Sequence, residues 1–239
     1  MFNLNIHVLK KLLLLALTFI SVVEVKSQII TSQDVDDAIS EIYGVQPKTG
    51  QEYMALADKL VTEYPLDQNQ QISFTTVIDA PNKTKDELFI MLNNWFVASF
   101  NSGKSVIQMA DKEQGVIIAK GYLSGVGNRT GFSKTVTVGE YIIIRLDIKD
   151  AKIRLITSIQ EYYMDTSIGV GQVLFGGRAL PDIEFPVYKG YPFDTKSYKK
   201  YKREAAIGYV GGIVYSKVLV DKIEKAINLG ITGTEGNDW

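Results

Sequence analysis

The chain contains no cysteine, and His7 is the only histidine among its 239 residues. The absence of cysteine excludes disulfide bonds, thiolate metal ligands and a thiol nucleophile. His7 lies in a segment that the sequence predicts to be removed, so the mature chain also lacks imidazole. Because general acid–base catalysis most often uses histidine, this composition disfavours most familiar active sites. No residue pattern indicates a metal or a cofactor.

The N-terminus has the pattern of a signal peptide. Lys10 and Lys11 precede an apolar run over residues 12–23, and small or β-branched residues lead to a cleavage site after Ser27. An uncleaved membrane anchor needs roughly 20 apolar residues, and Glu24 closes this run early. We therefore expect a soluble, exported mature protein in the periplasm, at the outer surface or outside the cell.

A strong net charge of either sign is also missing. The whole chain has 26 Lys and Arg against 27 Asp and Glu. Loss of Lys10, Lys11, Lys26 and Glu24 with the signal peptide leaves 23 against 26, a net charge near −3. Since this balance gives no phosphate-seeking surface overall, we expect no specific nucleic-acid partner.

Hydrophobic periodicity predicts the order of helices and strands. Two short helices are expected before the main domain, the second reaching Tyr64. A capping box at Thr84–Glu87 opens another helix, and a last helix runs from Lys202 to about Asn228. The expected strands are 72–79, 105–110, 115–123, 142–149 and 153–160. The order β-α-β-β-β-β-α predicts an α+β fold, with an antiparallel curved sheet of about five strands and helices on one face.

The same patterns divide the chain into five segments. They are the signal peptide 1–27, a helical extension 28–66, the α+β core 67–165, a loop segment 166–201 rich in glycine, proline and aromatic residues, and a C-terminal helix and tail 202–239. A structureless stretch as long as the fourth segment is unusual inside a domain. We therefore expect it to contain an extra hairpin, for example at Val173–Phe175, or to form a lid over the sheet.

Several motifs in fixed order resemble a known family. They are Thr84-Lys85-Asp86-Glu87-Leu88 leading to Trp95 and Phe100, then Val106-Ile107, Asp111-Lys112-Glu113, Gly115 and Lys120-Gly121. Together they resemble a family of exported bacterial domains of unknown function with a fold like that of the TATA-box-binding protein. The resemblance covers roughly residues 70–165 and implies an extracytoplasmic setting in Gram-negative bacteria. It implies no activity, ligand or catalytic residue, and fold likeness alone is no warrant for DNA binding.

The first candidate binding surface is the sheet face that the helices leave open. Alternation along the hairpin predicts that it carries Arg145, Asp147, Arg154 and Gln160, with Ile143 and Ile156 between them. An apolar strip bordered by charges suits a ligand or a protein partner. The alternative is that the loop segment 166–201 or the N-terminal helices lie across this face.

The second candidate is a basic stretch interleaved with tyrosine. It comprises Lys189, Tyr191, Tyr198, Lys199, Lys200, Tyr201, Lys202 and Arg203. Charge plus stacking could bind an anionic lipid head group, an acidic polysaccharide or a nucleic acid. The alternative is a solvated run of charge that leads into the last helix.

These observations favour an exported, non-catalytic domain that binds a ligand or protein partner at the cell envelope. No catalytic residue can be named. Two alternatives stay open: a histidine-free hydrolase that acts on glycans through paired carboxylates, and an envelope assembly protein that uses Ala205–Leu219 against a membrane or a second subunit.

Overall fold

The computed structural model describes residues 30–99, 107–130, 134–168, 174, 181–191, 193 and 201–229. The helices are α2 (Ser32–Tyr43), α3 (Gly50–Leu60), α4 (Lys85–Ser99) and α7 (Lys202–Leu229), with a short 3-10 helix η1 (Val187–Lys189). The strands are β1 (Ile72–Asp79), β2 (Ile107–Asp111), β3 (Val116–Thr130), β4 (Lys134–Lys149), β5 (Lys152–Ile168) and β6 (Ile183–Pro186). The predictions for 1–27, Tyr198, Lys199 and Lys200 lie outside the described residues.

The strands form one antiparallel sheet in the order β1-β5-β4-β3-β2. The long β4–β5 hairpin, whose predicted alternation is confirmed, is its centre. β1 pairs with β5 over 152–159, and β6 pairs with the same edge over 161–164. The predicted α+β fold with an antiparallel sheet is therefore confirmed. A sixth strand, β6, lies in the segment predicted to be a loop, and the proposed hairpin at 173–175 lies outside the described residues except for Leu174.

A bulge in β5 changes which side chains face the helices. Tyr141 of β4 is opposite Glu161, but the next residue, Ile142, is opposite Ile159, so Gln160 has no partner in the register. Before this point the buried residues of β5 are odd-numbered, and after it they are even-numbered, beginning with Tyr162. A single extra residue in one strand shifts the period-2 alternation in this way.

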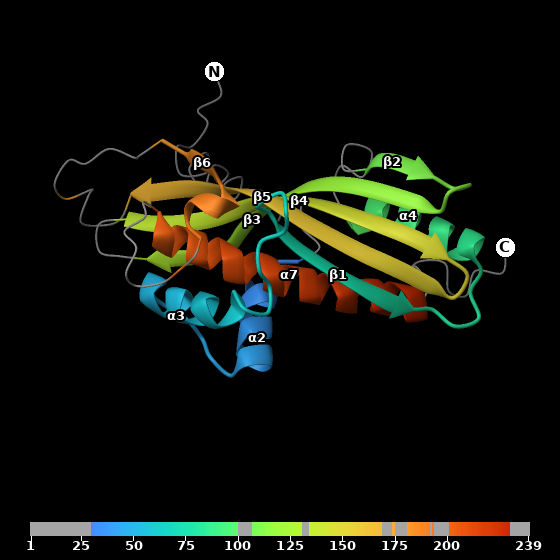
Figure 1. Ribbon diagram of the computed structural model, residues 1–239, viewed down its shortest axis with the longest axis horizontal. Helices are drawn as coiled ribbons and strands as arrows, with labels where there is room; N and C mark the ends of the chain where they lie inside the picture. Colours follow the sequence, from blue (N-terminus) through green and yellow to red (C-terminus); the bar gives the residue numbers. More distant parts are fainter. Residues whose placement is uncertain are drawn as a thin grey trace, which may run out of the picture.

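All four described helices lie on one side of the sheet (Figure 1). α7 runs along the sheet, α4 packs beside it, and α3 packs on the outer side of α7. α2 contacts both α7 and β3, where Ser32 donates a hydrogen bond to the carbonyl of Gly125. The N-terminal helices therefore do not lie across the open face. No helix in the described part of the chain is long and apolar enough to span a bilayer.

Local sequence signals explain where the helices begin. Thr31, Thr49 and Thr84 each sit before a helix and accept a hydrogen bond from a backbone N–H three residues later. Acidic residues at those later positions bond back to the threonine N–H, so all three form capping boxes, the predicted one at Thr84 included. The prediction that the second helix reaches Tyr64 was wrong: α3 ends at Leu60, and the Tyr64 carbonyl accepts a hydrogen bond from the Tyr209 hydroxyl.

Glycines let α7 approach the sheet closely. A Cβ at Gly211 would lie 2.6 Å from the Val126 carbonyl oxygen of β3. A Cβ at Gly208 would lie 2.5 Å from the ring of Tyr162, and one at Gly212 would lie 2.4 Å from Ile159 Cδ1. Because backbone cannot move as a side chain can, the absence of a side chain at Gly211 is needed for this approach of α7 to the β3 backbone.

Gly211→Ala should therefore destabilise the fold, although alanine favours a helix over glycine by roughly 1 kcal/mol. Overpacking of this kind costs about 1–3 kcal/mol. Chemical denaturation of the two proteins measures the difference. Glu224→Ala, at an exposed position of the same helix, should change the free energy of unfolding by less than about 0.5 kcal/mol. Equal stabilities for Gly211→Ala and the parent would contradict the close approach of α7.

Candidate functional site

The face of the sheet opposite α7 and α4 carries no described helix (Figure 1). On it, Arg145 of β4 lies opposite Ile156 of β5, and Asp147 lies opposite Arg154. Ile143, Ile156 and Asp147 are half-buried, and the two arginines are exposed. The structure thus brings together five of the six residues predicted for this face. Gln160, the sixth, is also exposed, but it falls at the bulge and has no partner in the register.

Two arginines share one carboxylate at this end of the face. Arg145 Nε donates to Asp147 Oδ1 at 2.8 Å, and Arg154 donates to Asp147 Oδ2 from Nε at 2.8 Å and from NH2 at 2.5 Å. Burial alone would raise the pKa of Asp147, but these hydrogen bonds outweigh burial and the pKa of Asp147 is lowered. The Arg145 and Arg154 side chains keep 45% and 55% exposure, so their remaining N–H groups face solvent.

Three tyrosines on neighbouring strands form a second group on the same face. Tyr122 of β3, Tyr141 of β4 and Tyr163 of β5 are here called the tyrosine cluster. The ring centroids of Tyr122 and Tyr141 are 5.1 Å apart, and those of Tyr122 and Tyr163 are 5.4 Å apart in an edge-to-face arrangement. Tyr122 is 40% exposed. The sequence interpretation did not single out this cluster.

The cluster depends on a glycine between the strands. Gly139 of β4 lies opposite Tyr163, and a Cβ there would lie 2.6 Å from the Tyr122 hydroxyl and 2.7 Å from the Leu123 carbonyl oxygen. The missing side chain lets the Tyr122 ring cross β4 and reach Tyr163. Any other residue at 139 would push that ring away from its neighbours.

Carboxylates orient two of the rings. The Tyr163 hydroxyl donates to Asp182, and the Tyr141 hydroxyl donates to Glu184 of β6 at 3.2 Å. The bond to Asp182 is the main reason why the pKa of Tyr163 rises to about 12. For Tyr141, burial and then the Glu184 bond raise the pKa. These bonds tie the cluster to the edge strand that sequence reasoning missed.

Among the described residues, the charges around the cluster are mostly negative. Glu161, Asp165, Asp182 and Glu184 are all exposed and belong to β5 or the β6 region. Lys120 of β3 supplies a cation, and its Nζ lies 5.8 Å from the centroid of the Tyr141 ring. Electrostatic repulsion from Asp165 and Asp182 adds to burial in raising the pKa of Tyr122. The cluster is therefore an aromatic surface in a negative field.

The second predicted surface, the basic stretch, is only partly exposed. Lys189 and Arg203 are exposed, but Lys202 is only 8% exposed. Tyr191 packs against Phe193 and Tyr209, and Tyr201 stacks on Phe185 at 5.2 Å between centroids. Of the predicted basic stretch, Lys202 is therefore buried, and Tyr191 and Tyr201 are half-buried. Apolar burial of the rings against α7 and β6 explains the difference from the prediction.

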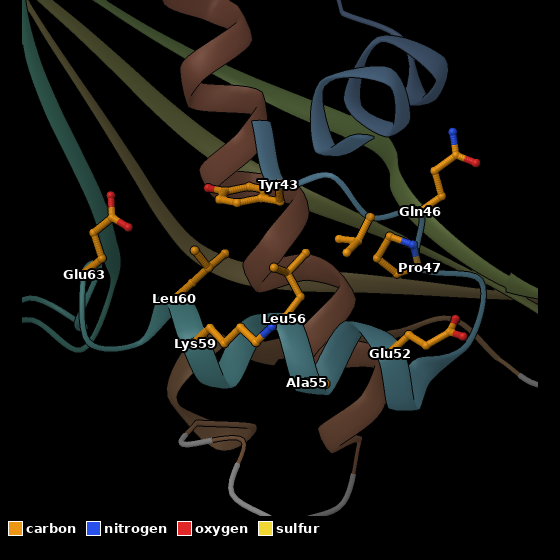
Figure 2. Close-up of a pocket in the computed structure, with 10 residues that line it drawn as sticks. Tyr43, Gln46, Pro47, Glu52, Ala55, Leu56, Lys59, Leu60 and Glu63 are labelled. Atoms are coloured by element: carbon orange, nitrogen blue, oxygen red, sulfur yellow. The ribbon is translucent and has the colours of Figure 1, made fainter. Parts of the chain in front are cut away.

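A hollow of about 570 Å³ lies between the end of α2, the following loop and α3. Figure 2 shows Leu56 and Leu60 of α3 pointing toward Tyr43, with Glu63 and Gln46 at opposite ends. Glu52 also lines the hollow, but its carboxylate accepts from the N–H groups of Lys48 and Thr49 and so caps α3. The hollow offers apolar contact, and nothing in it selects a ligand.

A buried carboxyl group lies on the other side of the sheet. Glu140 of β4 is fully buried under α7, and neither of its oxygens has a hydrogen-bond partner among the described residues. A Cβ at Gly212 would lie 2.6 Å from its Oε2. Tyr162 of β5 and Tyr215 of α7 are the titratable neighbours, and burial raises the pKa of both tyrosines. Burial likewise raises the pKa of Glu140 well above its ordinary value of 4.5.

In the described residues, this architecture is that of an α+β domain with helices on one face of the sheet and none on the other. Residues 74–162, from β1 to the middle of β5, match the family described as a domain of unknown function (DUF4468) with TBP-like fold. This stretch of the chain is therefore similar to that family. The match includes Tyr122 and Tyr141 and ends one residue before Tyr163.

Two solved structures resemble the chain. One is a TBP-like protein from Parabacteroides distasonis ATCC 8503, with 11% identity, a TM-score of 0.46, and coverage of 69% of this chain and 97% of that one. The other is a DUF4468 family protein from Bacteroides ovatus ATCC 8483, with 10% identity, a TM-score of 0.44, and coverage of 76% and 96%. No curated protein matches the sequence. None of these comparisons assigns a role to a residue.

The buried carboxyl group predicts a specific dependence of stability on pH. Because the folded pKa of Glu140 is raised, its contribution to stability is complete below the unfolded pKa near 4.5 and is lost as pH rises toward the folded pKa. Glu140→Met, which removes the carboxyl group, should therefore gain stability relative to the parent between about pH 5 and 8, by at most about 1.4 kcal/mol per pH unit. Urea denaturation across this range measures it. Parallel curves for the two proteins would show that Glu140 does not stay protonated in the fold.

Proposed function

We propose that the protein is a non-catalytic binding domain that works after export and uses the open face of its sheet to hold a partner. The observation that carries this proposal is the arrangement of that face: the tyrosine cluster, with Tyr122 exposed, lies at one end, and Arg145 and Arg154 lie at the other. The opposite face is filled by α7 and α4, so it offers no comparable surface.

The residue types on the open face support binding to a protein. Tyrosine and arginine are enriched among the residues that dominate binding energy at interfaces. Tyrosine loses little conformational entropy on contact because it has few rotatable bonds. Here that cost is lower still, since hydrogen bonds from Tyr141 and Tyr163 to β6-region carboxylates already orient two rings. Ile143 and Ile156 add half-buried apolar area between the two ends.

The chemistry of the same face supports binding over catalysis. Three carboxylates of the face are engaged with neighbours: Asp147 with two arginines, and Asp182 and Glu184 with tyrosine hydroxyls. The chain after Ser27 contains neither histidine nor cysteine. The pattern of residues 1–27 supports export, and hence a partner at the cell envelope.

Site-specific photocrosslinking tests this proposal in cells that make the full chain. A photoreactive phenylalanine analogue at Tyr122 should capture one defined macromolecule, and Arg145→Ala with Arg154→Ala should reduce that capture at least about tenfold. The melting temperature should change by only a few degrees, because both arginines are exposed.

The matched control carries the same analogue at Ile90, which is 51% exposed on α4 and lies on the covered side of the sheet. It should give no such adduct. Equal capture from Ile90 and Tyr122, or capture that survives loss of both arginines, would contradict the open face as the binding surface.

A further inference from the structure

We infer that the tyrosine cluster binds a lysine- or arginine-bearing segment of a partner protein. The inference rests on the proposed function, because it assigns a partner chemistry to one end of the open face. The cluster offers the faces of aromatic rings, a fixed geometry and a negative field, and a side-chain cation is the group that uses all three.

The charges select a cation over an anion. Four exposed carboxylates surround the three rings: Glu161, Asp165, Asp182 and Glu184. Lys120 is the cation that the structure places on the cluster. A phosphate, an acidic peptide or an anionic lipid would approach this group against its field, because like charges that meet at an interface cost several kcal/mol. An incoming ammonium or guanidinium group is attracted.

The ring geometry suits a cation as well. Tyr122 and Tyr163 meet edge to face, and the Tyr122 side of this pair is 40% exposed. The centre of an aromatic face is negative and attracts cations within about 6 Å. Gly139 and the two hydroxyl–carboxylate bonds hold the rings in place before any partner arrives.

The protein already uses its tyrosines in this way. Lys120 Nζ lies 5.8 Å from the centroid of the Tyr141 ring, so one ring of the cluster already carries an internal cation. On the other side of the molecule, Lys217 Nζ lies 5.3 Å from the Tyr43 ring and 5.1 Å from the Tyr64 ring. The latter site ties α7 to the end of α2 and to the segment that follows α3. It shows that a pair of tyrosines in this chain holds a lysine at cation–π distance.

NMR titration of the full-length protein with labelled tyrosine rings tests the inference. The probe is a short, unstructured peptide of lysine, glycine and serine, and matched peptides carry glutamine or glutamate in place of lysine. A neutral glucose oligosaccharide is the fourth probe. The lysine peptide alone should shift the Tyr122, Tyr141 and Tyr163 signals, and added salt should weaken the effect.

Two variants weaken the site in different ways. Tyr122→Ser should reduce affinity for the lysine peptide about fivefold. Asp182→Asn with Glu184→Gln should reduce it about tenfold, while the amide oxygens still accept the tyrosine hydroxyls. Asp58→Asn with Glu224→Gln removes the same charge from exposed positions on α3 and α7. It should leave the affinity within about twofold of the parent.

A third variant should raise the affinity for the lysine peptide. Unfolding would lower this affinity, so it cannot account for such a result. Lys120→Gln removes the internal cation from Tyr141 and should raise affinity for the lysine peptide about threefold. Lys225→Gln removes a charge of the same sign from an exposed position on α7 and should have no such effect. If both variants raise the affinity for the lysine peptide equally, the change in net charge explains the effect and the inference is overturned.

The probes separate the failure of this inference from the failure of the proposed function. Equal shifts with the glutamine peptide or the oligosaccharide would show that the cluster binds an uncharged ligand. The inference of a cation would then fail, but the proposal that the open face binds a partner would stand. If the glutamate peptide shifts the signals, and substitution of Arg145 and Arg154 abolishes those shifts, the binding site lies at the arginine end of that face. If no probe shifts the cluster while Tyr122 still crosslinks in cells, the lysine-bearing segment is rejected alone. If crosslinking also fails, both proposals fall.

Discussion

The close contact between α7 and the sheet is the constraint on which the rest of the structure depends. Gly208, Gly211 and Gly212 bring the helix to a distance at which no Cβ fits without displacing β3, β4 or β5 atoms. That contact fills the helix-covered side of the sheet, encloses Glu140, and gives α3 a surface on which to pack. Because a helix packed this tightly leaves no room for a ligand, any binding surface of the sheet has to be the opposite one. The spacing of glycines in α7 therefore determines which face of the sheet is packed against helices and which face is left for binding.

The bulge at Gln160 determines which side chains of β5 lie on each face of the sheet. Without the extra residue, Tyr162 would point outward and Tyr163 toward α7. With it, Tyr162 enters the core beside Gly208, and Tyr163 joins Tyr122 on the open face. The bulge also marks where the edge partner of β5 changes from β1 to β6. That change places Asp182 and Glu184 within reach of the cluster. One irregularity in one strand thus supplies a ring and positions two carboxylates.

The sequence predicted those parts of the fold that depend on local patterns. Alternation located the β4–β5 hairpin and put Arg145, Asp147 and Arg154 on one face, and a capping box located the start of α4. It could not predict the bulge, because Gln160 is compatible with a regular strand and only the partner register shows that it is unpaired. β6 has no periodicity of its own over four residues, so Asp182 and Glu184 could not be linked to Tyr163 or Tyr141. Lys202 and Glu140 are buried, although charged residues are usually exposed. Tertiary packing causes this burial, so the local sequence could not predict it.

The two ends of the open face carry opposite charge, and this limits what can bind there. Arg145 and Tyr141 are four residues apart on β4, a separation of about 13 Å along a strand. The arginine end has two guanidinium groups around one carboxylate, and the tyrosine end has four carboxylates and one nearby ammonium group. A partner segment that lies along β4 must therefore present unlike charges at positions about four residues apart, and reversal of that segment would place like charges together at both ends. Such repulsion costs more than the gain from any single contact on the rim. Under the proposed function, the face would discriminate by direction as well as by composition, since a partner with the same residues in the opposite order would meet like charges at each end.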